Sequence, residues 1–267
     1  MSININAILY AVAVLGGLGV VFGALLSLAD KVFAVEVDER ITLVRTAVAG
    51  ANCGACGYPG CDAYAQAVVK GEAATTLCTP GGVTTAAALA EIMGVAGEAL
   101  EPMVARIRCQ GGDGISKDRS SYQGYKSCRH AMSLAGGPKV CPSACVGLGD
   151  CFRACQFDAI SFVNNLCVID PAKCTACGMC VPACPNSLIK LLPRAATVTV
   201  RCMNTLAPKP ANDSCQFACI ACKRCEKACE YDAIHVTNFL ALIDTDKCTK
   251  CEACIAVCPK KCITLSA

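Results

Sequence analysis

The chain has 267 residues, a formal net charge of +3 and 26 cysteines, with few aromatic residues and no tryptophan. This much cysteine predicts either a disulfide framework or bound metal. Disulfide scaffolds are usually short and rarely repeat one cysteine spacing, so the composition favours metal in a reducing cytoplasm. The small net charge excludes any argument from basicity for nucleic-acid binding.

The first segment of the chain, Ala7 to Ala29, has 23 residues and no charged side chain. That length can cross the hydrocarbon core of a bilayer as one helix. A cleaved secretory signal is the alternative, because Ser27-Leu28-Ala29 resembles a cleavage site. No Lys or Arg precedes the run, which is also long for a signal, so residues 1–30 are predicted to be a retained transmembrane anchor.

Basic residues follow this anchor at Lys31, Arg40 and Arg45. Cytoplasmic flanks of membrane helices carry an excess of Lys and Arg. The sequence therefore predicts a single-pass protein of the cell (inner) membrane whose C-terminal domains are cytoplasmic.

The first cysteine motif has the spacing C-x2-C-x4-C-x16-C. Glycines and a proline between its cysteines let the backbone fold around a compact inorganic core. Four thiolates also suit structural zinc, but zinc knuckles pair C-x2-C motifs, and the neighbouring cysteine runs are of the redox type. Residues 31–83 are therefore predicted to form a small [4Fe–4S] domain, with Cys53, Cys56, Cys61 and Cys78 as ligands.

Residues 84–138 are predicted to form an α/β connecting region. Thr84 to Met93 is Ala-rich, starts with Thr and precedes Gly94, which indicates a helix. Met103 to Cys109 alternates as a strand does, and Gln110 to Tyr125 is polar and rich in Gly and Ser, which indicates a loop.

From Cys128 the sequence repeats itself with a constant offset of 74 residues. Nine cysteines match without a gap, which predicts two copies of one module. The matched residues are Cys128, Cys141, Cys145, Cys151, Cys155, Cys174, Cys177, Cys180 and Cys184, against Cys202, Cys215, Cys219, Cys225, Cys229, Cys248, Cys251, Cys254 and Cys258.

Each copy also contains a predicted β-hairpin between its cysteine groups, at 159–170 and at 233–244. We therefore predict two tandem bacterial ferredoxin-like modules of the βαββαβ type, each with two [4Fe–4S] clusters, at residues 139–193 and 214–267. A linker at 194–213 is expected to join them. The predicted fold class is α+β.

The run from Cys248 to Pro259, C-x2-C-x2-C-x3-C-P, is typical of two-cluster ferredoxins, in which the fourth cysteine binds the other cluster. In the first module Leu148 stands where the second has Cys222, and Cys141 is the simplest replacement ligand. The predicted sets are Cys248, Cys251 and Cys254 with Cys229; Cys219, Cys222 and Cys225 with Cys258; Cys174, Cys177 and Cys180 with Cys155; and Cys141, Cys145 and Cys151 with Cys184. Together with the Cys53 motif, these sets predict five clusters.

Six cysteines lie outside these sets: Cys109, Cys128, Cys167, Cys202, Cys215 and Cys262. Cys167, in a hairpin strand, and Cys262, near the end of the chain, are expected to be buried thiols. Cys128 and Cys202 match in the repeat and Cys215 matches a predicted ligand, so alternative ligation or a sixth cluster stays open.

No catalytic residue is predicted. The sequence has no P-loop, no glycine-rich nucleotide turn after a strand, no nucleophile elbow and no H-E-x-x-H motif. The chain is therefore expected to convert no substrate itself and to carry electrons through its cofactors. A non-redox metal or disulfide scaffold is the alternative from a different class.

One apolar helix, then GANCGACGYPGC with its Cys78, then tandem ferredoxin modules resemble the B subunits of the Rnf complex, the ion-translocating ferredoxin:NAD+ oxidoreductase. The most specific parts are Lys31 to Val37, running into the Cys53 motif, and Ala135 to Lys139, leading into the first module. The iron–sulfur subunit of another membrane oxidoreductase is the alternative hypothesis.

The resemblance implies a multisubunit membrane translocase. In it, this subunit accepts electrons from reduced soluble ferredoxin and passes them through [4Fe–4S] clusters towards flavin- and NAD-binding partners, coupled to export of Na+ or H+. Some family members have one ferredoxin module, so the second implies a longer path for electrons. The last module is expected to be outermost, where the soluble donor docks.

Overall fold

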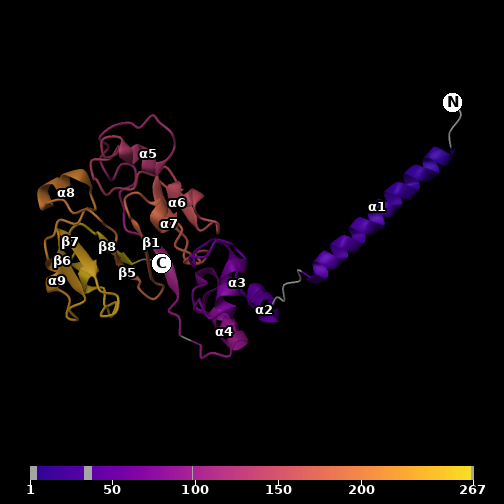
Figure 1. The fold of residues 1–267 in the computed structure, drawn as a ribbon. Coiled ribbons are helices and arrows are strands. Elements are labelled where there is room, and N and C mark those ends of the chain that lie inside the picture. Colours follow the sequence, from indigo (N-terminus) through magenta and orange to yellow (C-terminus); the bar gives the residue numbers. More distant parts are fainter. Residues whose placement is uncertain (1–4, 33–37, 98, 266–267) are drawn as a thin grey trace.

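The computed structural model describes residues 5–32, 38–97 and 99–265. In these residues the strands form four separate two-stranded antiparallel sheets. Figure 1 shows one long helix, α1 (Ile5–Val32), extending away from the folded remainder of the chain. Residues 33–37 of the Lys31–Val37 segment lie outside the described residues.

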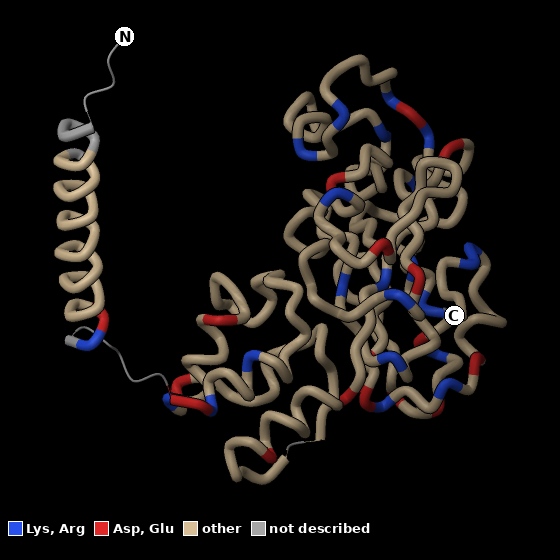
Figure 2. The backbone as a smooth tube through the Cα atoms, turned by 90° about the vertical axis from the view of Figure 1, so that its right-hand side faces the viewer, with Lys and Arg blue, Asp and Glu red and all other residues tan. Residues whose placement is uncertain are grey.

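Helix α1 contains the segment predicted to be the membrane anchor. It is long and apolar enough to cross a membrane, and its window Val12–Lys31 is not buried against the rest of the protein. Figure 2 shows charged residues spread over the folded part, whereas the described part of α1 carries them only at its C-terminal end, at Asp30 and Lys31. A helix whose apolar surface is exposed all round fits lipid better than water.

Three helices form a small domain after α1: α2 (Glu39–Ala47), α3 (Cys61–Val69) and α4 (Gly82–Met93), the last preceded by the 3-10 turn η1 (Thr79–Gly81). Their apolar faces meet at Val44, Tyr64 and Leu89, all fully buried. The predicted helix at 84–93 is confirmed as part of α4. Because α4 packs in this core, the small domain continues past residue 83.

The first ferredoxin-like set of elements consists of two strand pairs and two short helices. Strand β1 (Met103–Ile107) pairs with β4 (Ile189–Pro193), and β2 (Ile160–Val163) pairs with β3 (Leu166–Ile169). Helix α6 (Asp150–Arg153) precedes β2, and α7 (Cys180–Ala183) precedes β4. We call β1, α6, β2, β3, α7 and β4 the first set; helix α5 (Cys128–Ser133) lies between β1 and α6 in the chain.

The second set repeats this order. Strand β5 (Val198–Val200) pairs with β8 (Ile263–Leu265), β6 (Ile234–Thr237) pairs with β7 (Leu240–Ile243), and the helices are α9 (Arg224–Lys227) and α10 (Ala253–Ala256). Both predicted hairpins are therefore confirmed. Their two-residue turns have positive φ at both positions, as type I′ hairpins require: Asn164 and Asn165 in the first set, Asn238 and Phe239 in the second.

The first strand of each set lies outside the predicted module boundaries. Strand β1 falls in the expected connecting region, and β5 falls in the expected linker together with most of α8 (Pro208–Ser214). The strand predicted within Met103 to Cys109 is confirmed as β1. Strand β5 was not predicted, because a strand of three residues carries little signal in the sequence until its partner is known. With these strands included, each set has a cysteine two residues after the end of its first strand: Cys109 after β1 and Cys202 after β5.

The offset of 74 residues correctly relates β2, β3 and β4 to β6, β7 and β8, but it does not relate Cys128 to Cys202 in space. Because β4 pairs with β1 and β8 pairs with β5, the structural counterpart of Cys202 is Cys109. Cys128 and Cys202 match in the sequence repeat, but they do not occupy equivalent positions in the two sets.

We expect a chain that begins at Asp38 to move from the membrane to the soluble fraction when it is produced without other subunits. The physical reason is that α1 supplies the exposed apolar surface and packs against nothing else in the described structure. Fractionation of cell extracts measures the change, and an unchanged iron content per chain is the control for folding. Retention of the truncated chain in membranes would show that α1 is not the anchor.

Candidate iron–sulfur sites

All 26 cysteines are described, and all are free thiols in the structure. Among the described residues, no three His, Cys, Asp or Glu side chains are arranged to hold a single metal ion. Zinc requires four sulfurs about 2.3 Å from one point, whereas the thiolates of a cubane bind separate corners and lie farther apart. The thiols gather instead around cavities, and this arrangement fits [4Fe–4S] clusters.

One cavity of the first set is lined by a complete predicted set of ligands: Cys155, Cys174, Cys177 and Cys180. The backbone N–H of Ala105 in β1 donates to Cys174 Sγ at 3.4 Å. Burial, and after it the neighbouring thiols of Cys174, Cys177 and Cys151, raise the pKa of the Cys180 thiol to about 12. A buried thiolate is unfavourable unless a positive charge lies next to it. Iron ions of a cluster supply that charge, so buried thiols of this kind are suited to metal ligation.

The corresponding cavity of the second set is lined by Cys229, Cys248, Cys251 and Cys254, again as predicted. The backbone N–H of Ala233 donates to Cys229 Sγ at 3.4 Å. Cys251 is exposed to solvent.

The other predicted set of the second module also lies together. Cys219, Cys222 and Cys258 are each close enough to Cys225 to raise the pKa of its thiol, which burial raises first, to about 11. Cys262 is buried beside this group, with its sulfur 3.6 Å from Cys258 Sγ. A hydrogen bond from the Cys262 thiol lowers the pKa of Cys258 to about 5.

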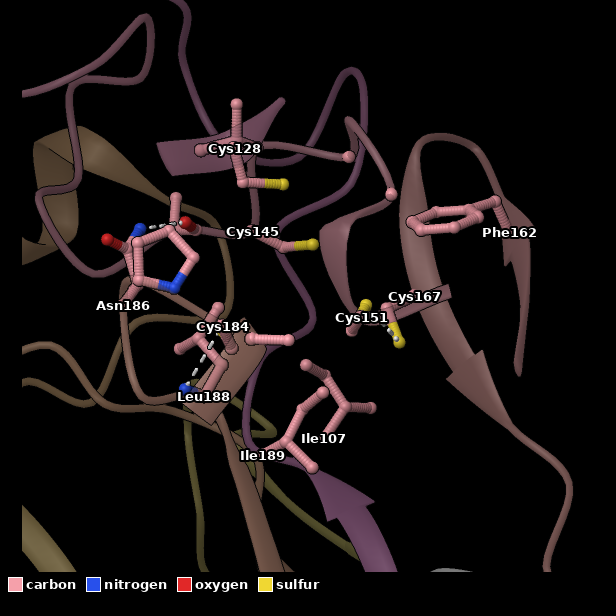
Figure 3. Close-up of a pocket in the computed structure, with 16 residues that line it drawn as sticks. Ile107, Cys128, Cys145, Cys151, Phe162, Cys167, Cys184, Asn186, Leu188 and Ile189 are labelled. Carbon is pink, nitrogen blue, oxygen red and sulfur yellow. Dashed lines mark hydrogen bonds between the residues drawn. The ribbon is translucent and has the colours of Figure 1, made fainter. Parts of the chain in front are cut away.

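The second cavity of the first set differs from the predicted set. It is lined by the thiols of Cys128, Cys145, Cys151 and Cys184, and Cys141 is not among its lining residues. In Figure 3 the sulfur atoms of Cys128 and Cys145 point into the same space, and Cys151 lies across it beside Cys167.

Cys128 is held at this cavity by the N-terminus of α5. Ser127 caps the helix, and its hydroxyl donates to the Asp150 carboxylate at 3.0 Å. The same carboxylate accepts from the backbone N–H of Arg129 at 2.9 Å. Although burial alone would raise it, these hydrogen bonds hold the pKa of Asp150 below its usual value. Asp150 starts α6, so it ties Cys128 to the neighbouring Cys151.

The buried thiol Cys167 supports this group without taking a ligand position of the repeat. The sulfurs of Cys151 and Cys167 lie 3.7 Å apart in a hydrogen bond, and this contact lowers the pKa of Cys151. The residue matching Cys167 in the second set is Ala241, and the residue matching Cys262 in the first set is Leu188; all four are buried. Cys167 and Cys262 therefore occupy core positions, as predicted.

Cys141 lies at a separate cavity, which it lines together with Cys109, Cys202 and Cys215. Cys109, Cys202 and Cys215 belong to none of the ligand sets predicted from the spacing, although the repeat left alternative ligation or a sixth cluster open for Cys202 and Cys215. The available signal was the recurrence of Ile107-Arg-Cys109 as Val200-Arg-Cys202, which has a different offset from the rest of the repeat.

The small domain holds the remaining predicted set, Cys53, Cys56, Cys61 and Cys78. Asn52, with φ 47°, turns the chain, and its side-chain oxygen accepts from the Cys61 backbone N–H at 2.8 Å. Burial, and after it the nearby Cys78 and Cys56 thiols, raise the pKa of Tyr64 to about 12. Tyr64 is therefore a neutral, buried side chain packed near these cysteines.

Three family models match the cysteine-rich parts of the chain. A putative Fe-S cluster family matches residues 49–80, a 4Fe-4S binding domain matches 167–190, and a 4Fe-4S dicluster domain matches 218–262. Each match covers cysteines that the structure brings together.

Relatives cover nearly the whole chain. The B subunit of the Na(+)-translocating ferredoxin:NAD(+) oxidoreductase complex of Acetobacterium woodii is 48% identical over 97% of this chain and 78% of its own length. The chain belongs to the family of B subunits of ion-translocating oxidoreductase complexes. The B subunit of the ion-translocating oxidoreductase complex of Methanosarcina acetivorans is 39% identical over 97% of this chain and 99% of its own. That of the proton-translocating ferredoxin:NAD(+) oxidoreductase complex of Clostridium ljungdahlii is 36% identical over 95% and 91%.

We expect Cys262→Leu, which introduces the residue found at the matching position of the first set, to leave the iron content unchanged and to lower the reduction potential of one cluster. Loss of the thiol hydrogen bonds to Cys219 and Cys258 leaves more electron density on those sulfurs. A redox titration followed by EPR measures the shift. Cys167→Ala is the matched control, because it should shift a different signal. Loss of about four iron atoms from Cys262→Leu would contradict the supporting role and indicate a ligand.

Proposed function

We propose that this chain is the electron-transfer subunit of a membrane-bound, ion-pumping ferredoxin:NAD+ oxidoreductase that exports Na+ or H+. In this role it accepts electrons from reduced soluble ferredoxin and relays them to partner subunits. It contributes no substrate-converting site of its own to the translocase. The printed functions of its relatives support the proposal, and the observation that carries it is the succession of cysteine groups along the folded part.

Two tandem ferredoxin-like modules and the small domain hold the clusters in this proposal. Each module corresponds to one βαββαβ set and binds two clusters. The proposed ligands are Cys53, Cys56, Cys61 and Cys78; Cys155, Cys174, Cys177 and Cys180; Cys128, Cys145, Cys151 and Cys184; Cys219, Cys222, Cys225 and Cys258; and Cys229, Cys248, Cys251 and Cys254. Cys128 takes the place predicted for Cys141, because its thiol lines the cavity.

Each bound cluster supplies a site that gains and loses one electron. The chain's contribution is to hold neighbouring cysteine groups close together. Burial raises the pKa of Cys177 in the first module, and the thiol of Cys53 in the small domain adds to this rise, so the two thiols lie within electrostatic range of each other. Cys151 of the next group contributes in the same way to the raised pKa of Cys180. The small domain therefore adjoins one site of the first module, and that site adjoins the other.

The proposed orientation puts all cysteine groups on the cytoplasmic side. Lys31, Arg40 and Arg45 follow the apolar part of α1, and this excess of positive charge favours a cytoplasmic C-terminal part. Soluble ferredoxin would then reach the second module, where Cys251 is exposed. The other membrane subunits would contact α1, whose surface is unpartnered in the described structure.

Deleting the gene for this chain should abolish ferredoxin-dependent reduction of NAD+ by membranes, and complementation with the wild-type gene should restore it. A chain with Cys251→Ala should restore less activity than wild type, because it weakens the site nearest to the soluble donor. The membrane assay with reduced ferredoxin measures both effects. Full activity in the deletion strain, or a purified protein that contains zinc and no reducible iron, would overturn the proposal.

For the first module we expect Cys128→Ala and Cys184→Ala to lose the same EPR signal and about four iron atoms each. Both thiols line one cavity with Cys145 and Cys151. Iron analysis and EPR of the dithionite-reduced protein measure this. If Cys128→Ala keeps every signal while Cys141→Ala loses that of Cys184→Ala, the set predicted from the spacing holds instead.

A further inference from the structure

We propose that Cys109, Cys141, Cys202 and Cys215 bind a sixth [4Fe–4S] cluster at the junction between the two modules. The inference rests on the proposed function only for the role of this cluster as an electron carrier. Its binding is argued from the cavity that the four thiols share.

The four cysteines come from four segments that are distant in the sequence. Cys109 follows β1, Cys202 follows β5, Cys141 lies in the loop ahead of α6, and Cys215 follows α8. All four line one cavity, and Cys109, Cys141 and Cys202 are buried. The four thiols therefore border one shared space at the junction.

Hydrogen bonds across the junction bring the segments together. Lys117 N–H donates to Ser214 O at 3.0 Å, and Gln216 N–H donates to Ile115 O at 3.2 Å, so that residues 115–117 pair with 214–216 on both sides of the Ser116–Cys215 bridge. This pairing fixes Cys215 against the loop that begins at Cys109.

The buried Lys139 fixes the segment of Cys141 against the same loop. Its ammonium group lies 3.3 Å from Asp113 and 2.8 Å from Asp118. Asp118 and Lys139 also form a β-bridge two residues before Cys141. Since the loop from Cys109 to Asp118 contacts both other segments, three of the four ligands are held in place before any cluster binds.

Polar groups around the cavity are placed to support sulfur ligands. Gly111 N–H donates to Cys109 Sγ at 3.3 Å, and Asn204 N–H donates to Cys202 Sγ at 3.4 Å. The Ser116 hydroxyl, in a residue only 2% exposed, lines the cavity and has no hydrogen-bond partner among the described residues. A buried hydroxyl of this kind is costly unless it finds an acceptor, and a cluster sulfur supplies one.

Two half-buried arginines place positive charge beside the cavity. Arg108 and Arg201 directly precede Cys109 and Cys202. Their guanidinium groups cross over: Arg108 Nε donates to Val200 O at 3.4 Å, and Arg201 Nη2 donates to Cys109 O at 3.2 Å. A cluster with four thiolates is negatively charged, so these two cations stabilise it and favour its reduced form.

The cavity also has the symmetry expected of a site shared by two modules. Cys109 and Cys202 each follow the first strand of a set, and Cys141 and Cys215 match in the 74-residue repeat. Each module therefore contributes one strand-end cysteine and one loop cysteine. Neither module contains the complete site.

This site lies between the cysteine group of Cys128 in the first module and that of Cys219 in the second. Ala144 lines both this cavity and that of Cys128. On the other side, Cys219 N–H donates to Cys202 Sγ at 3.4 Å, and Cys219 belongs to the second module. A cluster here connects the two modules into one uninterrupted series of six sites.

The test uses the full chain, purified anaerobically in detergent, with iron and sulfide analysis and EPR of the reduced protein. Wild type should contain about 24 iron atoms, six clusters of four. Cys109→Ala and Cys202→Ala, from different modules, should each fall to about 20 and should lose the same EPR component. Cys167→Ala is the control and should keep about 24, because Ala241 occupies the matching position of the second set.

A second variant distinguishes loss of one ligand from loss of folding. Cys109→Ser keeps an oxygen ligand and should alter the g-values or potential of that component alone. The inference is overturned if wild type contains about 20 iron atoms and the Cys109, Cys202 and Cys215 variants retain all signals. It survives if iron and EPR results are as expected while membranes lacking the chain still reduce NAD+ with ferredoxin, since that outcome contradicts only the proposed function.

Discussion

The fold depends on cysteine thiols that occupy positions where other proteins have large apolar side chains. The cores of the two βαββαβ sets contain Cys145, Cys151 and Cys180 in the first and Cys219 and Cys225 in the second, packed with a few aliphatic residues. Strands of three to five residues in two-stranded sheets bury little apolar surface on their own. Metal–thiolate bonds supply the missing stabilisation in small metal-binding domains, so cofactor binding and folding are coupled.

The duplication is regular in the spacing of most cysteines and irregular at a few positions. Leu148 stands where the second set has Cys222, and Cys128 reaches the cavity of Cys145 and Cys151 from α5, outside the regular run. A buried thiol lies beside Cys151 in the first set and beside Cys258 in the second. The two sets therefore place thiol hydrogen bonds on cysteines that are not equivalent in the repeat, and hydrogen bonds to ligand sulfurs are one means by which iron–sulfur proteins set reduction potentials.

Several kinds of contact hold the junction between the modules together. Backbone pairing of 115–117 with 214–216, the Lys139 ion pairs and the crossed arginines all converge there. Such contacts hold two modules in one orientation, whereas a flexible linker would let the distance between their clusters vary. A fixed distance is what a series of electron carriers needs, and helix α1 is long and apolar enough to cross a membrane.

The sequence by itself determined those parts of the protein whose structure depends on residues close together in the chain. An apolar run of 23 residues specified α1, the C-x2-C-x2-C spacing specified loops whose three thiols face one site, and the Asn-Asn and Asn-Phe turns specified the hairpins. Tertiary structure alone decided the sites whose ligands come from separate segments. Cys128 reaches its cavity through Asp150, and Cys109 and Cys202 become equivalent only because β1 pairs with β4 and β5 pairs with β8. No spacing along the chain records those pairings, because they depend on contacts between residues that are far apart in sequence.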